Sequence, residues 1–526
     1  MAMRLQIIAA ENFGEIYSAI NSELKSLTGK ESAVSPHTQE PLTNCCRLMG
    51  DAGTQVLLVQ KRVQDPDFSA EYAAYYSRQF SPVQKFCTRV HFFKNKLQEG
   101  EAALAYVDRI SEEDYLGFIT LRPVIKSPVG ASIINGIVTK GFVRSADNFP
   151  VHIAGKSYSV VGTPFMQQDN AVGACAQASI WMALRTLRKR EGDRAHDPAQ
   201  ITDAATRYFV TGRTRPNRQG LTEQQMTEAI RAAGYSPHLI PLGGFWYRNG
   251  QASMTDDAIS AAIQTIHPYV ESEIPVILIL YAPSGGHAIV VIGHTWESNP
   301  TARKLVAQSS NGTVFSFLHA ATWAPSFIIH NDNAGPYRLL TERSTSEYSM
   351  EHGASAIPLL PTDVFMSAEE AQTLALALMA DIFASFVAAG VKTAVEIQQL
   401  TETLVIRLSL VDKRKLRKWA ANNEMAPELK EEIRLMDSPK RLWVFELHKS
   451  DQYGLHELQA QKTQVGMILI DSTGDDLASS VLLMHMNLPE LLAGFTNGAL
   501  VKWDAQAGVP SAGTKTTEQG AICPIR

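Results

Sequence analysis

Two continuous apolar runs, separated by a short turn, constrain this fold more than any other feature of the sequence. The runs IPVILILY (274–281) and HAIVVIGH (287–294) are rich in β-branched residues, and neither contains Asp, Glu, Lys or Arg. Between them lies PSGG, a composition typical of a tight turn. We therefore expect two neighbouring buried strands in an antiparallel sheet.

The chain is too long for this strand pair to organise a single hydrophobic core. A length of 526 residues predicts two to four domains. We expect an N-terminal α/β region of unassigned role (1–148), a middle region in which helices precede the strand pair (149–345), and a C-terminal helical plus β region (346–526). The C-terminal region packing with the N-terminal region is one arrangement that we consider. The expected fold class is α+β, with mixed α/β flanking regions.

Charge and hydropathy argue against nucleic acid and membrane as partners. The 48 basic and 53 acidic side chains leave a net charge of only -5, which is too weak a field for nucleic acid. The most apolar segment, Leu374 to Val391, is nearly long enough to span a membrane but carries Asp381 in its middle. Ser367 and Glu370 form a capping-box pattern just before it, which predicts a buried helix of a soluble fold.

The five cysteines show neither a zinc-binding spacing nor a disulfide framework. We therefore expect no metal and no cofactor. The N-terminal residues lack the pattern of a secretory signal. A reducing cytoplasm is the expected compartment, and delivery or export by a route that the sequence does not show stays open.

Cys175, in the stretch NAVGACAQAS (170–179), is the candidate nucleophile. A polar, glycine-containing approach precedes it, and apolar residues at helical spacing follow to about residue 190, so Cys175 is expected at a helix N-terminus. A helix N-terminus and an adjacent imidazolium both lower the pKa of a thiol. His287 is the best of 14 histidines for the second role, because it follows two glycines at the exposed start of an apolar strand.

A third group must hold the imidazole in the required tautomer, and a carboxylate or an amide normally does so. The segment FIIHNDNAGPY (327–337) offers Asp332 at the end of a strand, with Asn331 and Asn333 as alternatives. Because side chains alternate between the two faces of a strand, only one face can be right. The sequence leaves that face open.

With these residues, the middle region resembles the papain-like cysteine peptidases and is most similar to the bacterial branch that includes the double-glycine leader peptidases. The similar features are a Gln ahead of Cys175, the helix after it, a second helix at GLTEQQMTEAIRAAG, the run PVILIL before GGHAIVVIGH, and the Asp-containing strand end followed by GPY. The resemblance implies an N-terminal helical lobe that carries the cysteine and an antiparallel sheet that carries the histidine and the aspartate.

The same resemblance implies that an upstream glutamine supports the oxyanion together with the backbone N–H of the cysteine. This role falls on Gln168, with Gln167 as the alternative. The sequence departs from the family in lacking the Cys-Gly-Ser-Cys-Trp signature, and Ala176 and Gln177 stand where the leader peptidases have Gly and Pro. The branch and the substrate therefore stay open.

The sequence thus predicts a cysteine peptidase that hydrolyses a peptide or amide bond through a Cys-His-Asp triad and a thioester. An acyltransferase, transpeptidase or deamidase would use the same residues with another acceptor or product. A non-catalytic papain-like binding module is the third reading. The expected partner is a peptide or protein substrate, and the flanking regions are candidate contacts for a regulatory protein or a cover over a latent site.

Overall fold

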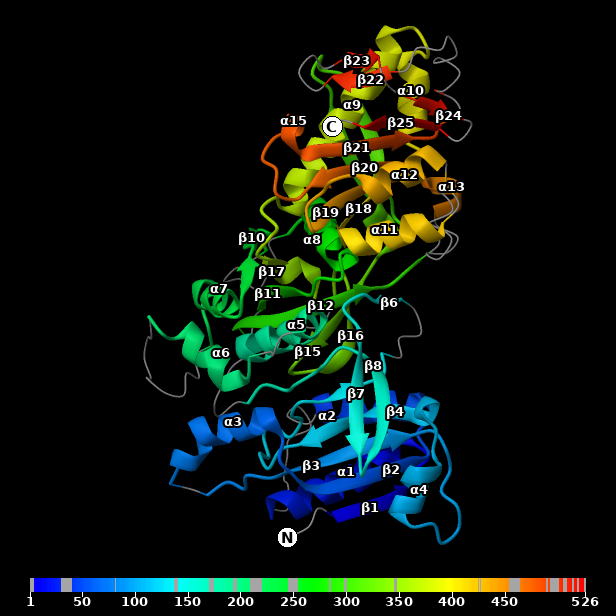
Figure 1. Cartoon of the computed structure of the whole chain (residues 1–526). Coiled ribbons are helices and arrows are strands. Elements are labelled where there is room, and N and C mark those ends of the chain that lie inside the picture. Colours follow the sequence, from blue (N-terminus) through cyan, green and yellow to red (C-terminus); the bar gives the residue numbers. More distant parts are fainter. Residues whose placement is uncertain are drawn as a thin grey trace. The chain divides into compact units, whose positions relative to one another are not determined.

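The computed structural model shows a mixed α/β protein arranged in two compact units (Figure 1). It describes residues 4–29, 40–80, 82–136, 141–169, 175–192, 196–208, 220–244, 254–282, 285–297, 300–344, 348–423, 425, 427–453, 464–488, 491, 501–504, 509–512, 515–517 and 520–524. Unit 1 comprises Met1–Met254, Glu273–His294 and Ser326–Leu359. Unit 2 comprises Thr255–Ser272, Thr295–Pro325 and Leu360–Arg526.

Two segments of the predicted middle region belong to unit 2. In one of them the helix α8 (Asp256–Glu271) packs against β18 (Leu404–Asp412). In the other, β14 (Val314–His319) pairs in parallel with β18. The two compact units reflect how segments pack together, and each unit contains several segments of the chain. The domain boundaries predicted near residues 148 and 345 therefore stay a prediction.

The N-terminal part of unit 1 is built on a five-stranded antiparallel sheet with the order β1-β2-β3-β4-β5. Its strands are β1 (Arg4–Ala9), β2 (Val56–Val63), β3 (Cys87–Phe93), β4 (Tyr115–Leu121) and β5 (Ile133–Ile134). The helices of this part are α1 (Phe13–Thr28), α2 (Glu40–Asp51), α3 (Pro66–Ala74) and α4 (Ala103–Arg109), and a hairpin of β7 (Asp147–Ile153) and β8 (Lys156–Gly162) follows.

The second sheet of unit 1 contains the strand pair expected from the two apolar runs. Its order is β10-β17-β11-β12-β15-β16, with β9 paired to β17 and β6 paired to β12. The strands are β6 (Phe142–Val143), β9 (Tyr235–Pro237), β10 (Ile240–Pro241), β11 (Val276–Ala282), β12 (Gly285–His294), β15 (Phe327–Asn331), β16 (Gly335–Leu340) and β17 (Gly353–Pro361). Strands β11 and β12 are antiparallel neighbours, as predicted. The predicted tight turn falls partly on residues 283 and 284, which lie outside the described residues.

Three helices accompany this second sheet, and the sequence predicted two of them. They are α5 (Cys175–Glu191), α6 (Pro198–Ala205) and α7 (Glu223–Ala232). The capping box of Thr222 and Gln225 begins α7 because each residue satisfies a backbone N–H of the other. Helix α5 packs against β12, and its apolar residues Ile180 and Ala183 are completely buried.

Unit 2 is built on an eight-stranded sheet with the order β13-β14-β18-β19-β20-β21-β25-β24. Its remaining strands are β13 (Lys304–Gln308), β19 (Arg441–Lys449), β20 (Gln464–Asp471), β21 (Val481–Met486), β24 (Lys515–Thr517) and β25 (Gly520–Pro524), and β22 (Val501–Asp504) pairs with β23 (Val509–Ala512). The helices are α8, α9 (Ala368–Ala388), α10 (Ala394–Thr401), α11 (Lys413–Asn422), α12 (Pro427–Leu435), α13 (Ser450–Tyr453) and α15 (Leu477–Ser480). Strands β19, β20 and β21 are consecutive antiparallel neighbours in this sheet.

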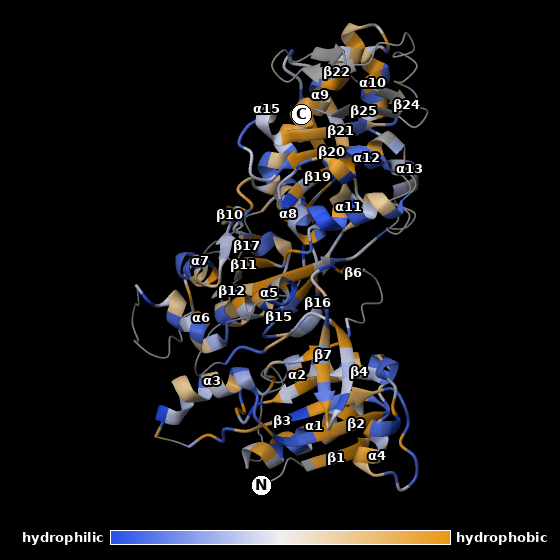
Figure 2. Ribbon diagram, in the orientation of Figure 1, coloured by the Kyte–Doolittle hydropathy of each residue, from blue (hydrophilic) through white to orange (hydrophobic). Residues whose placement is uncertain are grey.

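Helix α9 is the one described helix that has the length and hydropathy to cross a membrane. Half of its most apolar stretch is buried inside the protein. Hydrophobic residues of unit 2 gather on α9 and on β19 to β21 (Figure 2). The predicted capping box of Ser367 and Glu370 is present at its start. Asp381, in the middle of α9, accepts a hydrogen bond from the Ser310 backbone N–H at 2.6 Å. Asp381 is thus hydrogen-bonded to another segment of unit 2.

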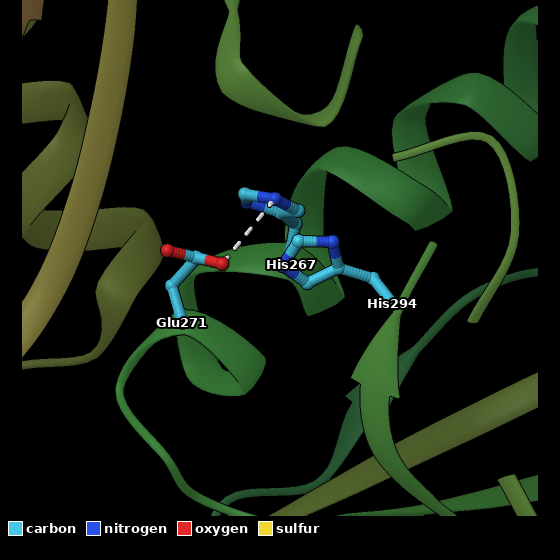
Figure 3. Close-up of side chains that lie close together, drawn as sticks. All are labelled: His267, Glu271 and His294. Atoms are coloured by element: carbon cyan, nitrogen blue, oxygen red, sulfur yellow. Dashed lines mark ion pairs between the residues drawn. The ribbon is translucent and has the colours of Figure 1, made fainter. Parts of the chain in front are cut away.

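Buried charges in unit 2 join α8 to the sheet. His267 and Glu271 lie one turn apart on α8, with Nε2 and Oε1 4.0 Å apart (Figure 3). The Arg407 guanidinium of β18 contacts Glu271, with Nε 2.6 Å from Oε2, and it contacts Glu446 of β19 at 3.0 Å. Two carboxylates therefore share one partly buried guanidinium across three elements.

Candidate active site

Cys175 is the first residue of α5 and lies against the start of β12. The backbone N–H of Ala288 donates a hydrogen bond to Cys175 Sγ at 3.4 Å, and the carbonyl of Ala288 accepts one from Ser179 Oγ at 3.0 Å. Ala288 lies beyond Val290–His330, the last pair between β12 and β15. Both of its backbone groups are thus hydrogen-bonded to side chains near the start of α5. The thiol is thereby fixed beside the residue that follows His287.

His287 is the third residue of β12 and is almost completely buried. Its Nε2 atom lies 3.0 Å from Asn331 Oδ1 and 3.5 Å from Asp332 Oδ1. Because Val290 pairs with His330, Asn331 continues β15 on the face that carries His287. Asp332 is the first residue of the turn after β15, and the bend of the chain there brings its carboxylate to the same ring.

The hydrogen bonds around Asn331 determine the tautomer of His287. Asn331 Oδ1 also accepts a hydrogen bond from the Asn333 backbone N–H at 2.9 Å, so the amide oxygen must point toward both groups. The ring atom that faces this oxygen, Nε2, must therefore be the protonated donor. In the neutral ring the other nitrogen, Nδ1, is then left to accept a proton.

Asp332 is completely buried, and its charge acts on both neighbours. Burial raises the pKa of its carboxyl to about 6, although the nearby His287 acts to lower it. When ionised, this carboxylate also raises the pKa of the neighbouring Cys175 thiol. The two alternatives for the third residue, Asn331 and Asp332, therefore both lie at Nε2 with different roles: Asn331 orients the ring and Asp332 supplies charge.

The surroundings of Cys175 differ from the low-pKa environment expected of a helix N-terminus. Burial raises the pKa of the thiol to about 12, and the negative charge of Asp332 adds to this increase. Such a thiol is protonated at neutral pH. The arrangement can therefore produce a nucleophile only if a base removes the proton as the sulfur attacks.

The two candidate glutamines point to different parts of unit 1. Gln168 Nε2 donates a hydrogen bond to Asn333 Oδ1 at 2.9 Å, which places this amide at the turn after Asn331. The side chain of Gln167 is buried, and its Oε1 accepts a hydrogen bond from the Val129 backbone N–H at 3.2 Å. The structure thus brings Gln168, and not the side chain of Gln167, to the group of His287 and Asn331.

Tyr348 is a neighbour of His287 that sequence reasoning missed. The two rings lie with their centroids 4.9 Å apart at an interplanar angle of 46°. Tyr348 follows β16 and is half-buried. It lies 61 residues after His287 with no motif around it, so no sequence signal could have assigned it to the site.

Comparison with known proteins adds no family to these observations. No protein-family model matches the chain, and no curated protein matches it. The geometry of Cys175, His287, Asn331, Asp332 and Gln168 is therefore the basis for assigning a function.

Proposed function

We propose that the chain is a cysteine peptidase with a papain-like central domain, which hydrolyses a peptide or amide bond. The observation that carries the proposal is the hydrogen bond from His287 Nε2 to Asn331 Oδ1, formed where the next residue of β12 contacts Cys175 Sγ. Because His287 Nε2 is hydrogen-bonded to the amide oxygen of Asn331, Nδ1 is left to act as a base toward the thiol. The order of these residues along the chain and their contacts support the Cys-His-Asn/Asp group that the sequence predicts.

In the proposed acylation, Cys175 Sγ attacks the carbonyl carbon of the scissile bond and its proton passes to His287 Nδ1. The C–N bond then breaks, the proton passes from His287 to the leaving amine, and a thioester remains on Cys175. In the second half, His287 removes a proton from water as its oxygen attacks the thioester carbon, the C–S bond breaks, and the proton passes from His287 to the departing Cys175 sulfur. The products are an amine and a carboxylic acid, and the enzyme is unchanged.

The negative charge on the carbonyl oxygen needs hydrogen-bond donors in both halves of this reaction. The backbone N–H of Cys175 is in the first turn of α5, where backbone N–H groups have no partner within the helix. The Gln168 amide carries two N–H bonds, and its contact with Asn333 uses one of them. We assign these two groups to the oxyanion hole.

The expected substrate is a peptide or protein, and the flanking regions are candidate contacts for a regulatory protein. A cytoplasmic location belongs to the same proposal. It is supported by four free thiols within the described residues, those of Cys45, Cys46, Cys87 and Cys175, since disulfides are rare in a reducing compartment.

The test compares the wild-type chain with Cys175→Ala. Both are incubated with a thiol-directed acyl probe and with a peptide library, and products are identified by mass spectrometry. We expect the probe on Cys175 only, and cut peptides from the wild type alone. Joined products or deamidated side chains would instead assign a transpeptidase, acyltransferase or deamidase. A native protein that is not labelled, while the denatured protein is, would leave the binding-module reading.

A further inference from the structure

A buried arginine from the N-terminal part of unit 1 holds the segment that carries Gln168. Arg122 follows β4 and is only 1% exposed. Its Nη2 donates to the carbonyl of Gln167 at 2.9 Å and to the carbonyl of Ser127 at 2.9 Å, and its Nη1 lies 3.3 Å from Glu71 Oε2. One guanidinium therefore ties the residue before Gln168 to a loop and to α3.

The segment is also bound on both sides of this contact. The Gln167 backbone N–H donates to the carbonyl of Val129 at 3.1 Å, and the Val129 N–H donates back to Gln167 Oε1 at 3.2 Å. On the other side of Gln168, the hydroxyl of Tyr76 donates to Asp169 Oδ2. Thus both chain neighbours of Gln168 are attached to the N-terminal part, while the Gln168 side chain points to Asn333.

Holding a short segment with a buried guanidinium has a cost in desolvation free energy. Burying a guanidinium is unfavourable unless its donors are satisfied, and Arg122 is buried beside Glu71, whose carboxyl pKa is raised by burial. A planar fork with five donors fixes its acceptors in position more strictly than a single hydrogen bond does. Removing Arg122 would leave the carbonyl of Gln167 without this donor, so the segment could shift relative to Cys175.

We propose that Arg122 is a positioning residue, which places the amide of Gln168 for oxyanion stabilisation through its bond to the Gln167 carbonyl. The N-terminal part of unit 1 is then a working part of the active site. This inference rests on the proposed function, because it assumes that Cys175 is acylated through an oxyanion.

Two reactions of the same thiol separate this role from a merely structural one. Acylation by an activated ester passes through a tetrahedral oxyanion and needs the hole, whereas alkylation by iodoacetamide is a direct displacement that forms no oxyanion. We expect Arg122→Met to lower the rate of Cys175 acylation by about 10- to 100-fold, as for a displaced or missing oxyanion donor. The alkylation rate should stay within about twofold of the wild type, because the thiol and His287 are not moved.

Three further variants of the full-length chain complete the experiment. Arg109→Met is the matched control, since Arg109 pairs with Glu101 in the same part of unit 1 but touches no residue of the Gln168 segment; we expect wild-type rates. Circular dichroism shows whether Arg122→Met folds. If it does not, Tyr76→Phe replaces it as the test variant, because this change removes only the hydroxyl that donates to Asp169. It should also lower acylation selectively. In a Gln168→Ala background, Arg122→Met should cause no further loss, because both changes act through one group.

Each outcome has one meaning. Equal acylation of the wild type, Arg122→Met and Tyr76→Phe would overturn the inference while leaving the proposed function intact. A parallel fall in acylation and alkylation would also overturn it, because a loosened structure would then be the cause. If the wild type itself is not acylated at Cys175, the proposed function fails, and the positioning role fails with it.

Discussion

His287 Nε2 lies 3.0 Å from Asn331 Oδ1, closer than the 3.5 Å that separates it from Asp332 Oδ1. The register of β12 and β15 places Asn331 on the histidine face, and Asp332 reaches the ring only because the chain turns after β15. The group that orients the imidazole and the group that carries the nearby charge are therefore consecutive residues. This division of roles makes the two side chains separable by mutation.

Replacing Asn331 tests the orienting role. In Asn331→Ala the imidazole loses the acceptor of its Nε2–H, so the tautomer with a basic Nδ1 is no longer favoured. We expect kcat/KM for peptide cleavage to fall by about 100-fold, the lower end of what a positioned general base contributes. Asn331→Asp keeps an acceptor oxygen at the same place and should retain more activity than Asn331→Ala. Equal activities of the wild type and Asn331→Ala would exclude this role.

Replacing Asp332 should stabilise the protein at neutral pH. Its folded-state pKa, about 6, lies above the value of roughly 3.9 for an unfolded chain. The folded protein therefore binds the proton more tightly, and this stabilising contribution, complete below pH 4, is lost as the pH rises through 6. Over that range the free energy of unfolding of the wild type should fall by about 3 kcal/mol relative to Asp332→Asn.

The measurement is urea unfolding of the wild type and Asp332→Asn at pH 4 and pH 8. Comparing the two proteins at each pH removes the contribution of other titrating groups. The stability difference should favour the variant more at pH 8 than at pH 4. A difference that does not change with pH would mean that Asp332 keeps an ordinary pKa in the folded protein.

The same substitution should accelerate alkylation of Cys175. The negative charge of Asp332 adds to the burial that raises the thiol pKa, so its removal increases the thiolate fraction. At pH 7.5 we expect Asp332→Asn to react with iodoacetamide about 10-fold faster at Cys175, which corresponds to about one pKa unit. Peptide mass spectrometry separates Cys175 from the other cysteines. A slower or unchanged reaction would show that Asp332 does not raise the pKa of the Cys175 thiol.

The sequence predicted the parts of the site that depend on local patterns. The strands around residues 276 and 287 follow from unbroken apolar runs, and the helix that begins at Cys175 follows from spacing. It could not choose between Asn331 and Asp332, because that choice depends on where β15 ends and turns. Tyr348 and Arg122 were missed for a related reason: neither lies in a motif, and each reaches the site through tertiary packing of a distant segment.

Arg407 in unit 2 offers a test of buried charge that is independent of catalysis. It joins Glu271 of α8 to Glu446 of β19. Although burial acts to raise the pKa of Glu446, the guanidinium lowers it below its usual value. Arg407→Met leaves the buried Glu271 and the partly buried Glu446 without this cation, and we expect it to reduce the free energy of unfolding by about 3–5 kcal/mol. The matched control is Arg441→Met, which removes an arginine from a pair whose partner, Asp363, is 39% exposed. That change should cost only about 0–1 kcal/mol. Denaturant unfolding of the full-length chain, followed by circular dichroism, measures both, and equal losses would show that burial does not set the strength of these pairs.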